Sequence, residues 1–273
     1  MKEKTSTKII IYFIILLLAI FWGFPVLWIF ISSFKPSELL SLKGLSLSFT
    51  PTIENYLYIF SRQPFASYLR NSLFITLISV ILALIIGIPA AYSMSRFNTG
   101  GPNYSFWILS SRFIPPAVIV LPFFIIFQGL DMFNTWWALI IVYILLNISY
   151  VIWLLRSFFD DVPKEIEEAA IVDGATYLQV LLKITIPISK PGIISVTILS
   201  SAFVWNEFLF ATILTLDKAA KTLPVAANDF VTGYAINWGP LFASGVLIGA
   251  PIFFFTLFIQ KHIVRGLTLG AIK

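Results

Sequence analysis

The sequence predicts an all-α membrane protein, and its composition and its hydropathy pattern both support this class. Of 273 residues, 59% are apolar and only 11% are charged, whereas soluble domains usually carry about 25% charged residues. Six stretches are apolar over the roughly 20 residues that a helix needs to cross a bilayer. We therefore expect a single transmembrane domain over residues 1–273 with six membrane-spanning helices.

The six expected spans are separated by polar connections. They are about Ile9–Ile31, Tyr68–Tyr92, Ser105–Phe127, Trp137–Leu155, Gly192–Leu214 and Pro240–Lys261. The first apolar run is about twice as long as the 7–15-residue core of a signal peptide, and no small-residue cleavage site follows it. We therefore expect it to be a retained helix.

The distribution of basic residues predicts the orientation in the membrane. Six spans place both termini on one side, and the segments on that side hold eleven Lys and Arg residues against six on the other. The remaining basic residue, Arg112, lies within a span. Because basic residues are enriched on the cytoplasmic side, both termini are expected in the cytoplasm.

Several function classes are excluded or disfavoured by what the sequence lacks. It has no cysteine and only one histidine, His262, so disulfides, thiolate chemistry and Cys or His metal clusters are not expected. It has no phosphate-binding loop of the G-x-x-x-x-G-K-[ST] type, so the chain is not expected to hydrolyse ATP itself. The net charge of +5 is spread along the chain and does not indicate nucleic-acid binding. No catalytic or metal site is assignable.

The loop between the fourth and fifth spans, residues 156–191, carries the signals of two short helices joined by a turn. Acidic residues suit the positive N-terminal end of a helix, a Gly after Asp suits a helix stop, and a Thr three residues before a Gln can form a capping box. These signals are, in order, Glu165, Glu167, Glu168, Asp173-Gly174 and Thr176–Gln179.

The first of these helices combines acidic residues with a small apolar edge. Ile166, Ala169 and Ala170 recur at spacings of three and four, so they share one helical face. Glu168 beside that edge offers a charge to a basic residue of a partner. The alternative is an amphipathic helix lying on lipid, but such helices are usually rich in Lys and Arg. The acidic composition favours docking to a protein.

The same loop resembles the EAA motif of ABC importer permeases. That motif is Glu-Ala-Ala, a Gly, and then Ile-x-Leu-Pro at fixed spacing. It corresponds here to Glu168, Ala169, Ala170, Gly174, Ile184 and Pro187, with Ile186 at the usual Leu position.

The resemblance extends over essentially the whole chain, to the smaller, maltose-type permease subunit of carbohydrate importers. The segments that carry it are Phe24-Pro25, Ser33–Pro36, Arg112 with Pro115-Pro116, Asn147 with Ser157–Phe159, Trp205–Phe208 and Val264–Thr268.

The resemblance implies a type I ABC importer permease in the inner membrane of a prokaryote. Such a permease pairs with a second, homologous permease and a dimeric ATPase that uses ATP and Mg, and it binds no cofactor itself. An extracytoplasmic binding protein delivers the carbohydrate, an oligosaccharide such as a disaccharide or a polyol. Glu168 is expected to contact the ATPase, and the residues expected to shape that contact are Ala169, Ala170, Asp173, Gly174, Ile184 and Pro187.

Polar residues within the spans are candidates for the translocation pathway. Arg112 and Glu207 are ionisable, and such groups are rare in hydrocarbon without a function. At about 1.5 Å per residue they should differ in depth by about 12 Å, so a direct ion pair is not expected. Snorkelling of Arg112 to the interface is the alternative role for that residue. Trp205 and Asn206 adjoin Glu207, and this polar spot is expected to line the pathway or to lock the contact between two permeases. Simple inter-helix bonding is the alternative.

A second candidate group lies in the fourth span. Tyr143, Asn147 and Tyr150 share one helical face. Aromatic rings stack on the CH faces of sugars, and amides bind hydroxyl groups, so Asn147 and Tyr150 are pathway candidates. Ordinary inter-helix bonding is the favoured alternative for this face.

Three other functions remain open at this point. The chain could be an ABC permease for another solute, such as an amino acid or an osmolyte. It could be an ion-coupled carrier in which Arg112 and Glu207 couple the ion, or a membrane scaffold without a transport role.

Overall fold

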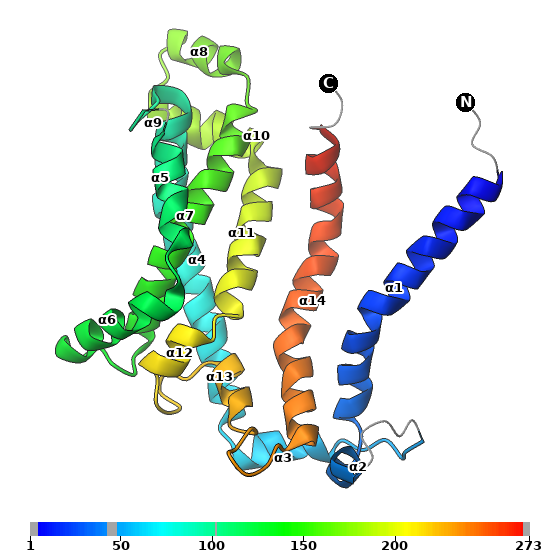
Figure 1. Ribbon diagram of the computed structural model, residues 1–273. Helices are drawn as coiled ribbons and strands as arrows, with labels where there is room; N and C mark the ends of the chain where they lie inside the picture. Colours follow the sequence, from blue (N-terminus) through cyan, green and yellow to red (C-terminus); the bar gives the residue numbers. More distant parts are fainter. Residues whose placement is uncertain (1–4, 43–47, 102, 270–273) are drawn as a thin grey trace. The chain divides into compact units, whose positions relative to one another are not determined.

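The computed structural model describes residues 5–42, 48–101 and 103–269 (Figure 1). Within these residues every regular element is helical, and the β-type pairing is limited to an isolated bridge between Val231 and Ile236. The predicted all-α class is confirmed.

The chain divides into two compact units. The first comprises residues 1–65 and 226–251, and the second comprises residues 66–225 and 252–273. Helix α13 (Leu223–Asn228) and the long helix α14 (Trp238–Leu269) each contribute residues to both.

The first unit contains α1 (Thr5–Ser33), α2 (Ser37–Leu42) and α3 (Glu54–Arg62). The most apolar window of α1 has none of its residues buried within the chain, so its side chains are available to lipid. Asn55 of α3 holds the segment after α1, because its Nδ2 donates to the carbonyls of Ser33 (2.8 Å) and Lys35 (2.7 Å). A Cβ at Gly239 would lie 2.1 Å from Asn55 Oδ1, so only glycine fits there.

The second unit is built around α7 (Trp136–Asp160), which packs between α4 (Phe65–Phe97) and α11 (Lys190–Trp205). More than half of the most apolar window of α7 is buried (56%), against a third of that of α4. Helix α7 is therefore the central helix, and it touches the elements on either side.

Two of the expected spans are broken. The third consists of α5 (Tyr104–Ser110), the 3-10 turn η1 (Ser111–Phe113) and α6 (Pro116–Gly129), with a bend of 86°. Pro115 and Pro116 cause this break, because proline lacks an N–H and clashes with the preceding turn. The fifth span stops at Trp205, and the chain resumes as α12 (Leu209–Leu214) after a short break.

Among the described residues, three helices are long and apolar enough to cross a membrane. They are Ile10–Ser33, Phe65–Phe97 and Trp136–Asp160, and the number rises to five if each of two bent helix pairs is one span. The apolar helix Trp238–Phe254 is shorter. It corresponds to the beginning of the sixth expected span.

Helix α11 packs so closely on α7 that no side chain fits at Gly192. A Cβ added there would lie 2.4 Å from Cγ of Phe158. Gly192→Val should therefore destabilise the protein by about 1–3 kcal/mol through overpacking, measured by thermal unfolding in detergent. Gly23→Val is the matched control, because nothing lies within 4 Å of the Cβ at that helical position. Equal stability of the two variants would contradict this packing.

Candidate functional site

The EAA-like loop folds into helix α8 (Lys164–Val172), which Figure 1 shows at one end of the second unit. The helix ends in a Schellman-type turn: the N–H of Gly174 donates to Ile171 O (3.0 Å) and that of Ala175 donates to Ala170 O (2.9 Å). Gly174 has φ +90°, a conformation that only glycine adopts without strain. The position of glycine in the motif thus follows from the backbone.

The second predicted helix begins with the expected capping box. Thr176 Oγ1 accepts from the N–H of Gln179 (3.3 Å), and the N–H of Thr176 donates to Gln179 Oε1 (2.8 Å). Helix α9 (Tyr177–Val180) is short and continues into a π-helical turn, η2 (Leu181–Thr185). Such turns are rare and often occur at functional sites. Ile184 lies in this turn, and Pro187 lies in the following α10 (Ile186–Ile188).

The outer surface of this loop combines apolar side chains with exposed carboxylates. Glu168 and Ala169 are exposed, as are Asp173, Gly174 and Pro187, while Ala170 and Ile184 are half-buried. The exposed large apolar side chains of the loop include Ile166, Val172 (87% exposed), Tyr177, Leu178 and Leu182. An exposed apolar patch rimmed by polar residues is typical of a contact surface for another protein or for a membrane.

The neighbouring residue Glu167 is buried and fully bonded. Its carboxylate accepts from Arg96 Nε at 2.7 Å and Nη2 at 3.0 Å, from Thr185 Oγ1 at 2.7 Å and from Tyr92 OH at 3.3 Å. Burial alone would raise the pKa of Glu167, but the hydrogen bonds from Arg96 and Thr185 outweigh it and keep this pKa below its usual value. Glu167 is therefore ionised at neutral pH.

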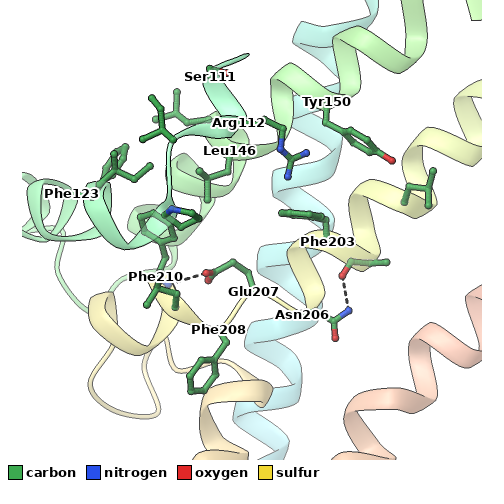
Figure 2. Close-up of a pocket in the computed structure, with 17 residues that line it drawn as sticks. Ser111, Arg112, Phe123, Leu146, Tyr150, Phe203, Asn206, Glu207, Phe208 and Phe210 are labelled. Atoms are coloured by element: carbon green, nitrogen blue, oxygen red, sulfur yellow. Dashed lines mark hydrogen bonds between the residues drawn. The ribbon is translucent and has the colours of Figure 1, made fainter. Parts of the chain in front are cut away.

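A cavity of about 870 Å³ lies within the second unit (Figure 2). Its walls come from η1, α6, α7, α11 and α12 and are mostly apolar. The lining residues used below are Arg112, Tyr150, Phe203, Asn206, Glu207 and Phe210.

The cavity brings together four of the six pathway candidates: Arg112, Tyr150, Asn206 and Glu207. The other two, Asn147 and Trp205, do not line it. They are buried in the unit, at 1% and 4% exposure.

Arg112 lies over aromatic rings inside this cavity. Its guanidinium carbon is 4.2 Å from the ring centroid of Phe203 and 5.2 Å from that of Tyr150, and Figure 2 shows the side chain next to both rings. Aromatic faces stabilise a cation through their quadrupole. Within the described part of the chain its N–H groups have no hydrogen-bond acceptor, so they are available to a solute.

Glu207 occupies the break between α11 and α12. Its carboxylate accepts from Tyr143 OH (2.8 Å) and from the N–H groups of Phe210 (2.9 Å) and Ala211 (3.1 Å) at the start of α12. In the described residues no ion pair joins it to Arg112. Asn206 beside it donates to Ala202 O (2.8 Å).

The described residues contain no cluster of three or more His, Cys, Asp or Glu side chains that could hold a metal ion. The groups that the cavity offers are one cation, one carboxylate, an amide and aromatic rings. Such a set suits binding of a polar solute by hydrogen bonds and ring stacking.

A sequence profile described as "Binding-protein-dependent transport system inner membrane component" matches residues 83–269. The chain belongs to this family. Among its relatives, the trehalose transport system permease protein SugB of Mycobacterium tuberculosis is 37% identical over 252 residues, which is 91% of this chain and 92% of the relative. The trehalose/maltose transport system permease protein MalG of Thermococcus litoralis is 32% identical, over 100% and 99% of the two chains.

Solved structures with a similar fold were also found. A chain of a bacterial ABC transporter involved in the import of the acidic polysaccharide alginate superposes with a TM-score of 0.75 at 21% identity, covering 96% of this chain and 98% of that one. A chain of the MetNI methionine ABC transporter gives 0.60 at 16% identity, covering 78% and 98%. The fold is therefore that of a type I ABC importer permease, as expected.

Proposed function

We propose that the chain is the permease subunit of an ATP-driven carbohydrate importer and performs no covalent chemistry. The main support for this proposal is helix α8, which exposes acidic and apolar side chains at the end of a transmembrane unit. The substrates in the relatives' names support the carbohydrate assignment: trehalose, trehalose and maltose, and sulfoquinovosyl glycerol. A disaccharide-sized oligosaccharide or a polyol is the substrate class.

The proposal includes three protein partners. A second homologous permease completes the pathway, a dimeric ATPase that uses ATP and Mg binds the surface around α8, and an extracytoplasmic binding protein delivers the sugar. One similar solved structure is a bacterial alginate ABC transporter in complex with an alginate pentasaccharide-bound periplasmic protein, which supports the third partner. If a cytoplasmic ATPase docks on α8, six spans put both termini in the cytoplasm as well.

Within this proposal, the cavity forms part of the translocation pathway. Tyr150 and Phe203 offer ring faces to the CH groups of a sugar, while Arg112 and Asn206 offer hydrogen-bond donors to its hydroxyl groups. Most small-molecule sites combine an apolar wall with a few convergent polar groups. Glu207 holds the wall of the cavity at the break between α11 and α12, where its carboxylate accepts the N–H groups of Phe210 and Ala211.

The first test is purification of the tagged protein from its native membranes in mild detergent, with mass spectrometry of the proteins that accompany it. Recovery of a second permease and an ATPase is the expected result. Recovery of the chain alone under several detergents would contradict the proposal.

Reversing the charge of Glu168 tests the docking surface. Glu168→Lys should abolish sugar uptake and copurification of the ATPase, because it places a cation where a basic partner residue is expected. Insertion into the membrane should be unchanged, because the side chain is exposed. Uptake and the ATPase content of the purified complex are the measurements.

The matched control for this reversal is Glu165→Lys, which changes another exposed glutamate, in the first turn of α8. It should have a much smaller effect. Normal uptake by Glu168→Lys would show that α8 docks through other residues.

A further inference from the structure

We propose that the buried ion pair between Arg96 and Glu167 is the joint through which displacement of α8 moves the transmembrane helices. This role is a positioning role, and it rests on the proposed function. Neither residue belongs to the exposed face that a partner would contact: their side chains are 7% and 4% exposed.

The geometry of the pair fixes both the distance and the direction of α8. Two nitrogens of Arg96 hold the two oxygens of Glu167, at 2.7 Å and 3.0 Å. Bidentate pairs of this kind are among the strongest and most directional hydrogen-bonded contacts in proteins. An apolar contact would allow α8 to slide, whereas this pair resists both sliding and rotation.

The same two side chains tie α8 to three other elements. Arg96 lies at the end of α4, and its Nη2 also donates to Phe159 O (2.8 Å) near the end of α7 and to Val162 O (3.1 Å). Glu167 in turn accepts from Thr185 in η2, which leads through α10 into α11. A displacement of α8 is therefore applied to α4, α7 and α11 together.

Two of these helices carry the walls of the cavity. Tyr150 lies on α7 and Phe203 lies on α11, and both rings face Arg112. Helices α7 and α11 also pack directly on each other. The Arg96–Glu167 joint thus connects the docking helix, by continuous contacts, to the residues that are placed along the pathway.

The contrast with Glu168 separates docking from transmission. Glu168 is one residue further along α8 but points outward and is exposed. Loss of Glu168 should remove the partner, whereas loss of the Glu167 charge should leave the partner bound but acting on a loosened helix.

The first experiment measures how firmly α8 is held. The chain has no cysteine, so spin labels can be placed at Glu165→Cys on α8 and Ser157→Cys on α7, both exposed positions outside the apolar docking surface. In the full chain purified in mild detergent we expect a narrow distance distribution for the otherwise wild-type protein. It should broaden in Glu167→Gln and Thr185→Val, and it should stay narrow in Glu168→Gln and in Thr185→Ser, which keeps the hydroxyl. An unchanged width in Glu167→Gln and Thr185→Val would overturn the proposal.

The second experiment compares uptake of labelled trehalose and maltose with ATP hydrolysis by the purified, reconstituted complex. Glu167→Gln should lower uptake on the order of tenfold while the ATPase remains bound and most of its hydrolysis persists. A parallel fall in uptake, hydrolysis and ATPase content would show a general loss of structure and would overturn the joint. If the wild-type complex takes up neither sugar, trehalose and maltose are excluded as its substrates, and the distance measurement still decides the role of the pair.

Discussion

Replacing Arg96 by Met should lower the stability of the protein by about 3–5 kcal/mol, because it leaves a buried carboxylate without its counter-charge. Glu167 is ionised and almost fully buried, so it cannot recover the lost interaction from water. The variant also removes the donors to Phe159 O and Val162 O. Thermal or denaturant unfolding of the detergent-purified protein measures this effect.

Two further variants make this measurement specific. Lys183→Met removes an exposed cation from the same region and should change stability by less than about 1 kcal/mol. Combining Arg96→Met with Glu167→Leu removes both charges and should recover part of the loss, since the cost comes mainly from the unpaired ion. A loss below about 1 kcal/mol for Arg96→Met would mean that the pair is not held away from solvent.

The elements that depend on neighbouring residues were predictable from the sequence. The capping box of Thr176 and Gln179 and the turn at Gly174 involve groups only three to five residues apart, so local chemistry determines them. The apolar stretches likewise identified where helices occur. The all-α class and the loop helices follow from these local signals.

The Arg96–Glu167 joint was missed because its partners are 71 residues apart in the chain. From the sequence, Glu167 is only an acidic residue that suits the N-terminal end of a helix. Arg96 is only one of the basic residues that predict the orientation in the membrane. One signal was present: Glu167 shares a helical face with Ala170 and Ile171. A carboxylate on an otherwise apolar face needs a partner if that face is buried.

The breaks in the spans show a second limit of sequence reasoning. Pro115 and Pro116 break the third span because proline lacks an N–H, but the packing of the helices determines the angle of the bend. The stop after Trp205 has no proline or glycine to mark it. It arises where the Glu207 side chain accepts the first N–H groups of α12 and the hydroxyl of Tyr143, and this last contact spans 64 residues. The periodicity of apolar residues does not determine how far α7 is rotated about its axis. In the structure this rotation leaves Asn147 outside the cavity.

Glu207→Gln should lower sugar uptake on the order of tenfold or more while the ATPase stays bound. The carboxylate accepts three hydrogen bonds, two of them from backbone N–H groups. An amide has only one acceptor oxygen, so its NH2 group would face an N–H donor, a mismatch that costs about 1–3 kcal/mol. If the mismatch raises the free-energy barrier of the transport cycle by this amount, the rate of uptake falls by about tenfold or more.

Neighbouring residues provide the controls that separate a pathway role from an assembly role. Asn206→Ala removes a side chain whose amide, among the described residues, donates to Ala202 O of its own helix, and it should reduce uptake less. Tyr143→Phe removes one of the three donors and should give an intermediate loss. If Glu207→Gln instead releases the ATPase or the second permease, Glu207 serves assembly. Uptake at the wild-type rate would place the translocation route outside this cavity. A solute that passed through the cavity would be slowed by the mismatched amide in its wall.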